Sequence, residues 1–310
     1  MTRRISIVAI PLLLAGVQAP VSLNGHQRAV TSVACSPDGR WIASGSLDHT
    51  ARLWDIPSQR EVRVLKGHNA EVYAVAFSPD SRYIASAGRD RRVLLWEVAT
   101  GKLARTIEGF PDWSVAIGFS PDGAHIAIGR QDGKVEIHDV TAIKSPTILA
   151  SKEPFYSVGA LAYSPDGKFL AMSWTRVVVW DLHKGDVAAT LRIPQGFISS
   201  ILFSPDGSLI AAACFDKSVH IWSTATWKAG PVLQAAPAKL PLAAIAFSPD
   251  SRRLATAGAD KPIWLWDVTQ ATLLRTFEGH TMTVTGLAFT PDGETLVSGS
   301  LDQTVRLWSW

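Results

Sequence analysis

A short motif, Ser or Thr followed by Pro-Asp, returns along the chain at a nearly constant interval. It starts at residues Ser36, Ser78, Ser120, Ser164, Ser204, Ser248 and Thr290, with successive copies 40 to 44 residues apart. A period of this size indicates a repeat protein, in which each unit needs its neighbours to bury its apolar face. The 310 residues therefore predict one domain of seven packed units, where length alone would suggest about two domains.

The second copy shows what one unit must be. In residues 71–77 apolar strand-forming residues alternate along the chain, which predicts a strand. This strand is expected to end at Pro79-Asp80, a sequence typical of a type I turn. Residues 83–86 and 93–98 predict two more strands, and residues 103–107 a fourth. Each unit is therefore expected to be a four-stranded antiparallel sheet.

A second motif accompanies this period. In the second copy Gly67-His68 is followed by Asp90, 22 residues after the histidine, and by Trp96 six residues later. From about residue 20 to the C-terminus the chain resembles the WD-repeat family, which implies an all-β, seven-bladed β-propeller of four-stranded antiparallel blades. The resemblance also implies a hydrogen-bonded network of His, Ser or Thr, Asp and Trp inside each blade. The complete sets are His26, Ser44, Asp48 and Trp54; His68, Ser86, Asp90 and Trp96; and His280, Ser298, Asp302 and Trp308.

The other four copies depart from this pattern. Blade three has Phe110, Ile128 and His138 at three of the four positions, and Phe110 is interpreted as a core residue that replaces the histidine. Blade four has Trp174 in place of the aspartate, blade five has Ala212 in place of the serine, and blade six lacks the Gly-His. Because buried polar networks tie a blade together, we expect blades three to five to open most easily.

The two ends of the chain carry separate signals. Residues 1–19 combine Arg3-Arg4 with an apolar run, which resembles a secretory signal peptide, although Pro20 would disfavour cleavage after Ala19. The alternative is an apolar N-terminal arm before the propeller of residues 20–310. A cleaved leader implies a secreted or periplasmic protein, and an uncleaved arm a cytoplasmic one.

The last copy is too short to supply its own fourth strand, because two residues follow Trp308. We expect residues 20–23 to pair beside residues 304–308 and to close the ring with a strand from the other terminus. Such closure removes an unpaired sheet edge.

The residue types of a hydrolase triad occur in His26, Ser44 and Asp48, but the same trio recurs in three blades and always ends on a Trp. Repetition of this kind is typical of a structural network, so no catalytic residue and no enzymatic activity are expected. His49, His125, His183 and His220 are scattered without paired spacing, and no metal site or cofactor is predicted. Cys35 and Cys214 fall on separate blades, which disfavours a disulfide.

Charge and hydropathy limit the partners. The net charge of +3 is small for this length, and Arg89, Arg91 and Arg92 form a basic turn without a matching stripe on other blades, so no nucleic acid is expected. The apolar run at the N-terminus is too short to span a bilayer comfortably, so no transmembrane span is expected. The propeller is expected to be a monomeric disc within a complex.

The resemblance marks positions that face outward from the narrower rim of the disc, and several carry large apolar or charged side chains. They are Leu47, Glu71, Tyr73, Arg89, Trp113, Phe197, Phe215 and Leu301. Exposed aromatics beside an arginine are typical of interface hot spots, although Trp113 could also tuck between blades. We expect a non-enzymatic scaffold or adaptor that binds a protein or peptide there. The alternative is an enzyme or small-ligand-binding protein that uses the central mouth.

Overall fold

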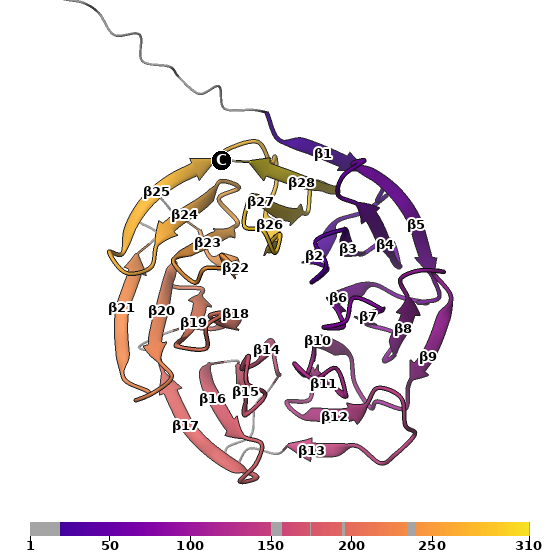
Figure 1. The fold of residues 1–310 in the computed structure, drawn as a ribbon, viewed down its shortest axis with the longest axis horizontal. Coiled ribbons are helices and arrows are strands. Elements are labelled where there is room, and N and C mark those ends of the chain that lie inside the picture. The colour runs from indigo at the N-terminus through magenta and orange to yellow at the C-terminus, as the bar shows by residue number, and fades with distance from the viewer. Residues whose placement is uncertain (1–18, 150–156, 174, 194–195, 235–239, 310) are drawn as a thin grey trace, which may run out of the picture.

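The computed structural model describes residues 19–149, 157–173, 175–193, 196–234 and 240–309, and these residues form seven four-stranded antiparallel sheets around a central axis (Figure 1). Blades one to four consist of β2 (Val30–Cys35), β3 (Trp41–Ser46), β4 (Thr50–Asp55) and β5 (Arg60–Lys66); β6 (Val72–Phe77), β7 (Tyr83–Gly88), β8 (Val93–Glu97) and β9 (Leu103–Ile107); β10 (Ser114–Phe119), β11 (His125–Arg130), β12 (Val135–Asp139) and β13 (Thr147–Leu149); and β14 (Ala160–Tyr163), β15 (Phe169–Ser173), β16 (Arg176–Asp181) and β17 (Asp186–Arg192). Blades five to seven consist of β18 (Ile198–Phe203), β19 (Leu209–Cys214), β20 (Ser218–Ser223) and β21 (Ala229–Gln234); β22 (Leu242–Phe247), β23 (Arg253–Gly258), β24 (Ile263–Asp267) and β25 (Thr272–Phe277); and β26 (Val284–Phe289), β27 (Thr295–Ser300), β28 (Thr304–Ser309) and β1 (Val21–Asn24).

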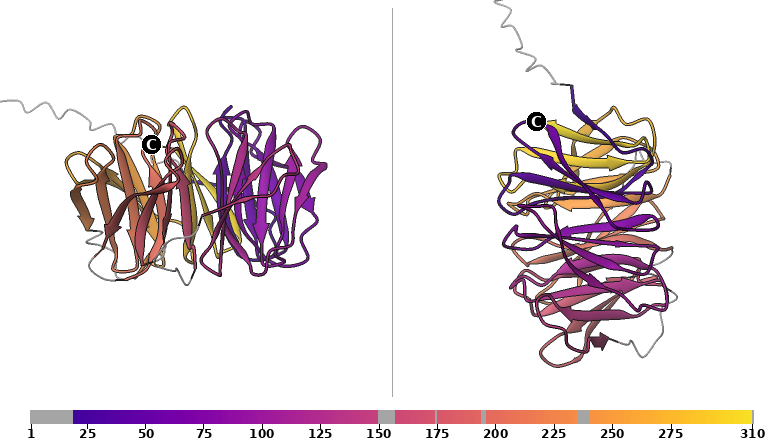
Figure 2. Two further views of the ribbon diagram at one scale, coloured as in Figure 1. Left: turned by 90° about the horizontal axis from the view of Figure 1, so that it is seen from below. Right: turned by 90° about the vertical axis from the view of Figure 1, so that its right-hand side faces the viewer.

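The first strand of each blade lies nearest the axis, and the fourth lies at the circumference (Figure 1). Seen from the side, the molecule is a disc whose strands cross its thickness (Figure 2). The connections between strands therefore gather on the two flat sides of the disc, which we call its two rims. The predicted seven-bladed all-β propeller is confirmed, and the four strands expected in the second copy agree with β6 to β9 within two residues at each end.

The ring is closed by the N-terminal strand, as the short last copy predicts. β1 pairs antiparallel with β28, with Val21 opposite Leu307 and Asn24 opposite Thr304. Leu23 is buried within this pairing. The paired residues are 21–24, one residue further along the chain than expected. The predicted signal peptide falls on residues 1–18, which lie outside the described residues, and on Ala19.

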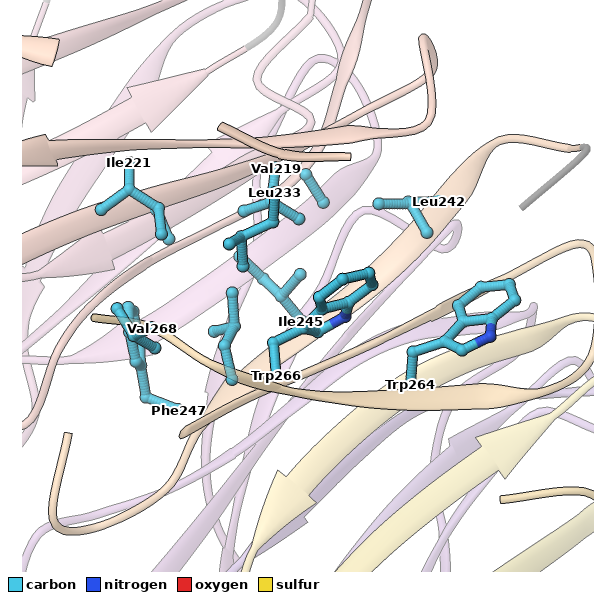
Figure 3. Packing of buried hydrophobic residues seen from close by; sticks show 12 residues of the cluster. Val219, Ile221, Leu233, Leu242, Ile245, Phe247, Trp264, Trp266 and Val268 are labelled. Carbon is cyan, nitrogen blue, oxygen red and sulfur yellow. The ribbon is translucent and has the colours of Figure 1, made fainter. Parts of the chain in front are cut away.

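The hydrophobic core is divided among the contacts between blades. The described residues form seven clusters of buried side chains, and each cluster combines residues from two neighbouring blades. Figure 3 shows the cluster between blades five and six, in which Val219, Ile221 and Leu233 pack against Ile245 and Trp266. No blade therefore buries its apolar faces alone, which is the physical reason for the repeat architecture.

The Ser-Pro-Asp turn explains why its motif recurs. In blade one Ser36 Oγ donates to Asp38 Oδ1 at 2.5 Å and accepts from the Trp41 backbone N–H at 2.8 Å. The residue after the aspartate has a positive φ, which glycine adopts in five blades. In blade two the position is Ser81, with φ of 60°, and its hydroxyl accepts a bond from the Asp38 N–H. That bond links the turns of neighbouring blades.

Candidate functional site

The polar networks fix the loops that carry the candidate site. In blade two His68 Nδ1 lies 2.9 Å from Asp90 Oδ2, His68 Nε2 lies 2.8 Å from Ser86 Oγ, and Trp96 Nε1 donates to Ser86 Oγ at 2.9 Å. The same three contacts, at 2.7 to 2.8 Å, join the sets His26, Ser44, Asp48 and Trp54, and His280, Ser298, Asp302 and Trp308. The structure thus assembles all three networks expected from the sequence.

These trios do not have the geometry of a hydrolase. The hydroxyls of Ser44, Ser86 and Ser298 are fully buried, and each accepts the indole N–H of the blade's tryptophan. A neutral imidazole that donates from Nδ1 to the carboxylate and accepts the serine proton at Nε2 satisfies every group. Burial lowers the pKa of His280 against the opposing effect of Asp302, which favours this neutral form. Each of these serines is therefore held in a structural contact inside its blade.

Incomplete blades use other contacts. In blade six Trp266 Nε1 donates to Thr256 Oγ1 at 2.9 Å. In blade three Phe110 is buried with its ring edge-on to His138, which confirms it as a core residue. His138 Nε2 lies 2.9 Å from Glu136, and Glu136 is paired with the buried Arg130. Sequence reasoning missed this buried ionic cluster. Trp174 of blade four lies outside the described residues.

A repeated backbone bond places the expected partner-binding residues on one rim. The residue before each turn aspartate donates its N–H to the carbonyl of the segment that enters the first strand. The pairs are Leu47 to Ala29, Arg89 to Glu71, Gln131 to Trp113, Phe215 to Phe197, Ala259 to Pro241, and Leu301 to Thr283. Seven of the eight expected residues take part in these bonds, and the eighth, Tyr73, contacts the Trp113 ring, so the expected residues lie around the same rim.

Four of these residues form a contiguous group, which we call the Trp113 cluster: Glu71, Tyr73, Arg89 and Trp113. The Arg89 guanidinium lies 4.6 Å from the centroid of the Trp113 ring, and its Nη1 lies 3.3 Å from Glu71 Oε1. The rings of Tyr73 and Trp113 lie 6.3 Å apart. The Arg89 side chain is 47% exposed, so the cluster offers a charged group beside two half-buried aromatic rings.

The other four positions do not belong to this cluster. On blade five Phe197 and Phe215 pack edge-on with ring centroids 6.0 Å apart, and both are exposed, at 43% and 48%. Leu47 and Leu301 are half-buried on blades one and seven. The expected surface therefore consists of one four-residue cluster, one aromatic pair and two separate leucines.

The basic turn of blade two lines a hollow on this rim together with Glu108 and Phe110. Arg92 donates to Asp90 at 2.7 Å and to the Gly67 carbonyl at 2.7 Å, and Arg91 reaches the Pro111 carbonyl at 3.4 Å. The three arginines of this turn are thus held by local contacts.

The opposite rim carries a groove that the sequence analysis did not anticipate. It runs between the turns of blades one and two, where Arg40 stacks on Trp41 at 4.6 Å and Arg82 lies 5.7 Å from the Tyr83 ring. The signal was available, because an arginine precedes an aromatic residue at the start of the second strand in both copies.

The scattered histidines and the two cysteines occupy different surroundings. Cys35 and Cys214 are free thiols, as their separation predicts, and burial raises the pKa of each to about 12. His125 Nε2 lies 3.8 Å from Asp139, and His183 is exposed. His220 is different, because it lies against Cys214 and Asp216, a grouping that the sequence analysis missed.

A family model described as "WD domain, G-beta repeat" matches residues 18–55, 59–97, 101–139, 185–223, 238–267 and 271–309, well over half of the chain. The chain belongs to the WD-repeat family. The segment between the third and fourth matches contains β14 to β16 of blade four, whose copy carries Trp174 in place of the aspartate. This WD-repeat protein thus departs furthest from the family pattern there.

Curated relatives share short segments with this WD-repeat protein. "Ribosome biogenesis protein BOP1 homolog" of Monosiga brevicollis is 50% identical over 42 residues, which are 14% of this chain and 5% of the relative. "Protein HIRA" of Dictyostelium discoideum is 35% identical over 94 residues, 26% of this chain and 8% of the relative. "Guanine nucleotide-binding protein subunit beta" of Saccharomyces cerevisiae is 30% identical over 86 residues, 26% of this chain and 20% of the relative. The chain thus covers a fifth or less of each relative.

The residues described contain no helix that is long and apolar enough to cross a membrane.

Proposed function

We propose that this propeller is a non-enzymatic scaffold that binds a protein or peptide on the rim that carries the Trp113 cluster. The single observation that carries the proposal is the arrangement of Arg89, which stacks on Trp113 while 47% of its side chain remains exposed. An arginine and aromatic rings in one preformed group are the residue types that dominate interface energetics.

The chemistry of the cluster suggests the kind of partner. The rings of Tyr73 and Trp113 provide apolar area, while Arg89 and Glu71 offer a cation and an anion for polar contacts. Phe197 and Phe215 supply a second apolar contact on blade five, and Leu47 and Leu301 extend the surface to blades one and seven. Because these side chains are carried by paired strands, little conformational change is expected on binding.

The relatives support a role in assemblies. The yeast relative is named as a subunit, and the Monosiga relative is named for ribosome biogenesis. Repeats like those of this chain therefore occur in proteins that work with other macromolecules. The identity of the partner does not follow from this similarity, because fold and function are separable.

The compartment follows from the fate of residues 1–19. Cleavage of this predicted signal peptide would place the scaffold in the periplasm or outside the cell, and its retention would favour the cytoplasm. N-terminal sequencing of the mature protein distinguishes the two outcomes.

The test compares partners recovered from the source cell by the wild type and by a rim variant, Tyr73→Ala with Trp113→Ala and Phe197→Ala. The matched control is Arg40→Ala with Arg82→Ala, which removes two arginines from the groove on the opposite rim. All three proteins must first melt alike. A partner kept by the wild type and the control but lost by the rim variant supports the proposal. A partner retained by the rim variant at wild-type yield contradicts it.

A further inference from the structure

The turn between β19 and β20 of blade five gathers three side chains that can bind a metal ion. Within the described residues, Cys214, Asp216 and His220 form the one group of at least three His, Cys, Asp or Glu side chains whose donor atoms all lie within 4.8 Å of one another. Cys214 ends β19, Asp216 lies in the turn, and His220 lies on β20. The strand pairing accounts for their proximity, because His220 lies opposite Ala212, two residues before Cys214 on the same face.

Local contacts hold the carboxylate of Asp216 in place. Its Oδ1 accepts hydrogen bonds from the Ser218 hydroxyl at 2.5 Å and from the Ser218 backbone N–H at 3.0 Å. Its other oxygen, Oδ2, lies 3.8 Å from His220 Nε2, which is too far for a hydrogen bond. One oxygen is therefore fixed by the turn, and the second is directed toward the imidazole.

The other two metal-donor atoms, His220 Nε2 and Cys214 Sγ, make few hydrogen bonds. His220 Nε2 is buried and has no hydrogen-bond partner, while the imidazole ring is stacked on Trp222 with centroids 5.9 Å apart. The Cys214 thiol is fully buried, and its polar contact is a weak one of 3.7 Å to the Ala212 carbonyl. A buried nitrogen without a partner calls for an explanation, and a bound ion beside it provides one.

We propose that Cys214 Sγ, Asp216 Oδ2 and His220 Nε2 bind a divalent transition-metal ion of the zinc class. Sulfur and imidazole donors favour such an ion over magnesium or calcium, which prefer oxygen ligands. Zinc–ligand bonds of about 2.0–2.3 Å place tetrahedral donor atoms about 3.3–3.7 Å apart, so donor atoms that lie within 4.8 Å of one another need to approach by about 1.5 Å at most. The metal displaces the thiol proton to solvent, and the partly exposed Asp216 leaves the fourth position open to water.

The position of the site in the blade indicates its role. In blades one, two and seven the turn aspartate is tied to a histidine and through it to a serine on the second strand. In blade five that serine is replaced by Ala212. A metal held by Cys214, Asp216 and His220 would join β19 to β20 across the same turn, in place of the missing network.

The first experiment is a titration of metal-free protein with Co²⁺, followed by displacement with Zn²⁺. A thiolate ligand to Co²⁺ gives a charge-transfer band in the near ultraviolet, and the band should saturate at one ion per chain. We expect Cys214→Ser to abolish the band and His220→Gln to weaken binding more than about 100-fold, since even the loss of an outer-shell partner costs 10–100-fold. The matched control, Cys35→Ser, removes the other free thiol and should keep the band.

Thermal unfolding supplies a second readout that does not depend on the cobalt spectrum. An ion that binds the folded chain alone raises the melting temperature with its concentration. Zn²⁺ should therefore raise the melting temperature of the wild type and of Cys35→Ser but leave that of Cys214→Ser unchanged. The proposal is overturned if the wild type gives no charge-transfer band, if Cys35→Ser loses it, or if zinc stabilises Cys214→Ser as much as the wild type.

Discussion

Trp96 Nε1 donates a hydrogen bond of 2.9 Å to Ser86 Oγ, an atom that is buried in the interior of blade two. The same hydroxyl lies 2.8 Å from His68 Nε2, so one serine joins an indole on the third strand to an imidazole in the loop before the first. Two strands and the loop before the first strand are thus joined through a single oxygen atom. The contact explains why the Trp and the Gly-His keep a constant separation in the complete copies.

We expect Ser86→Ala to lower the free energy of unfolding by about 2–4 kcal/mol, because it leaves two buried groups, on Trp96 and His68, without partners. Thr256→Val in blade six leaves one buried group, the Trp266 indole N–H, without a partner. It should lower the free energy of unfolding by about 1–3 kcal/mol. Urea-induced unfolding measures both. The exposed Ser208→Ala is the control, expected to change stability by less than about 0.5 kcal/mol. A cost for Ser86→Ala no greater than the control's would show that the network is energetically neutral.

Acid should weaken the networks through their carboxylates. Burial raises the pKa of Asp90, but hydrogen bonds from His68, the Asn69 backbone N–H and Arg92 outweigh it and hold this pKa at about 2. The hydrogen bonds from Thr304 and His280 do the same for Asp302. A lowered folded-state pKa stabilises the protein above the unfolded value near 4, and that contribution is lost as the pH falls from about 4 to about 2. Asp90→Asn should therefore flatten the dependence of the melting temperature on pH in this window. Parallel curves for the variant and the wild type would contradict the prediction.

Much of the fold could be predicted because the repeat carries its information locally. The Ser-Pro-Asp turn fixes where each first strand ends, and β1 supplies the fourth strand of the last blade, as expected. The His68, Ser86, Asp90 and Trp96 contacts follow from the family resemblance, since the same spacing produces the same register in every complete blade.

The remaining features depend on cross-strand neighbours that a linear motif does not display. Cys214 and His220 meet because β19 and β20 pair with Ala212 opposite His220. Arg130 and Glu136 meet by the same diagonal, since Ile128 lies opposite Glu136. The division of the rim residues into the Trp113 cluster and separate positions likewise depends on side-chain directions. Applying the strand register of blade two to the incomplete blades would have found the first two groups.

Hydrogen exchange should differ around the ring. Blades seven, one and two are neighbours and contain the complete networks, so their backbone amides should be the most protected. We expect the backbone amides of blades three to five to exchange fastest. Blade three tests this expectation most strictly, because the buried pair Arg130 and Glu136 partly replaces the network there. Exchange measured by mass spectrometry on peptides from each blade checks this. Uniform protection around the ring would show that packing between blades, and not the networks, controls opening.

The closing strand should be essential to stability. Deletion of residues 1–24 removes β1 and exposes the edge of β28, whereas deletion of residues 1–18 leaves the pairing of Val21 to Asn24 intact. We therefore expect the longer deletion to lower the melting temperature well beyond the shorter one. Leu23→Ala tests the same contact without truncation and should cost about 2–5 kcal/mol, because Leu23 is buried against blades seven and one. Ser22→Ala, at an exposed position of the same strand, should change stability by less than about 0.5 kcal/mol. Equal melting temperatures for the two deletions would mean that the ring stays closed without β1.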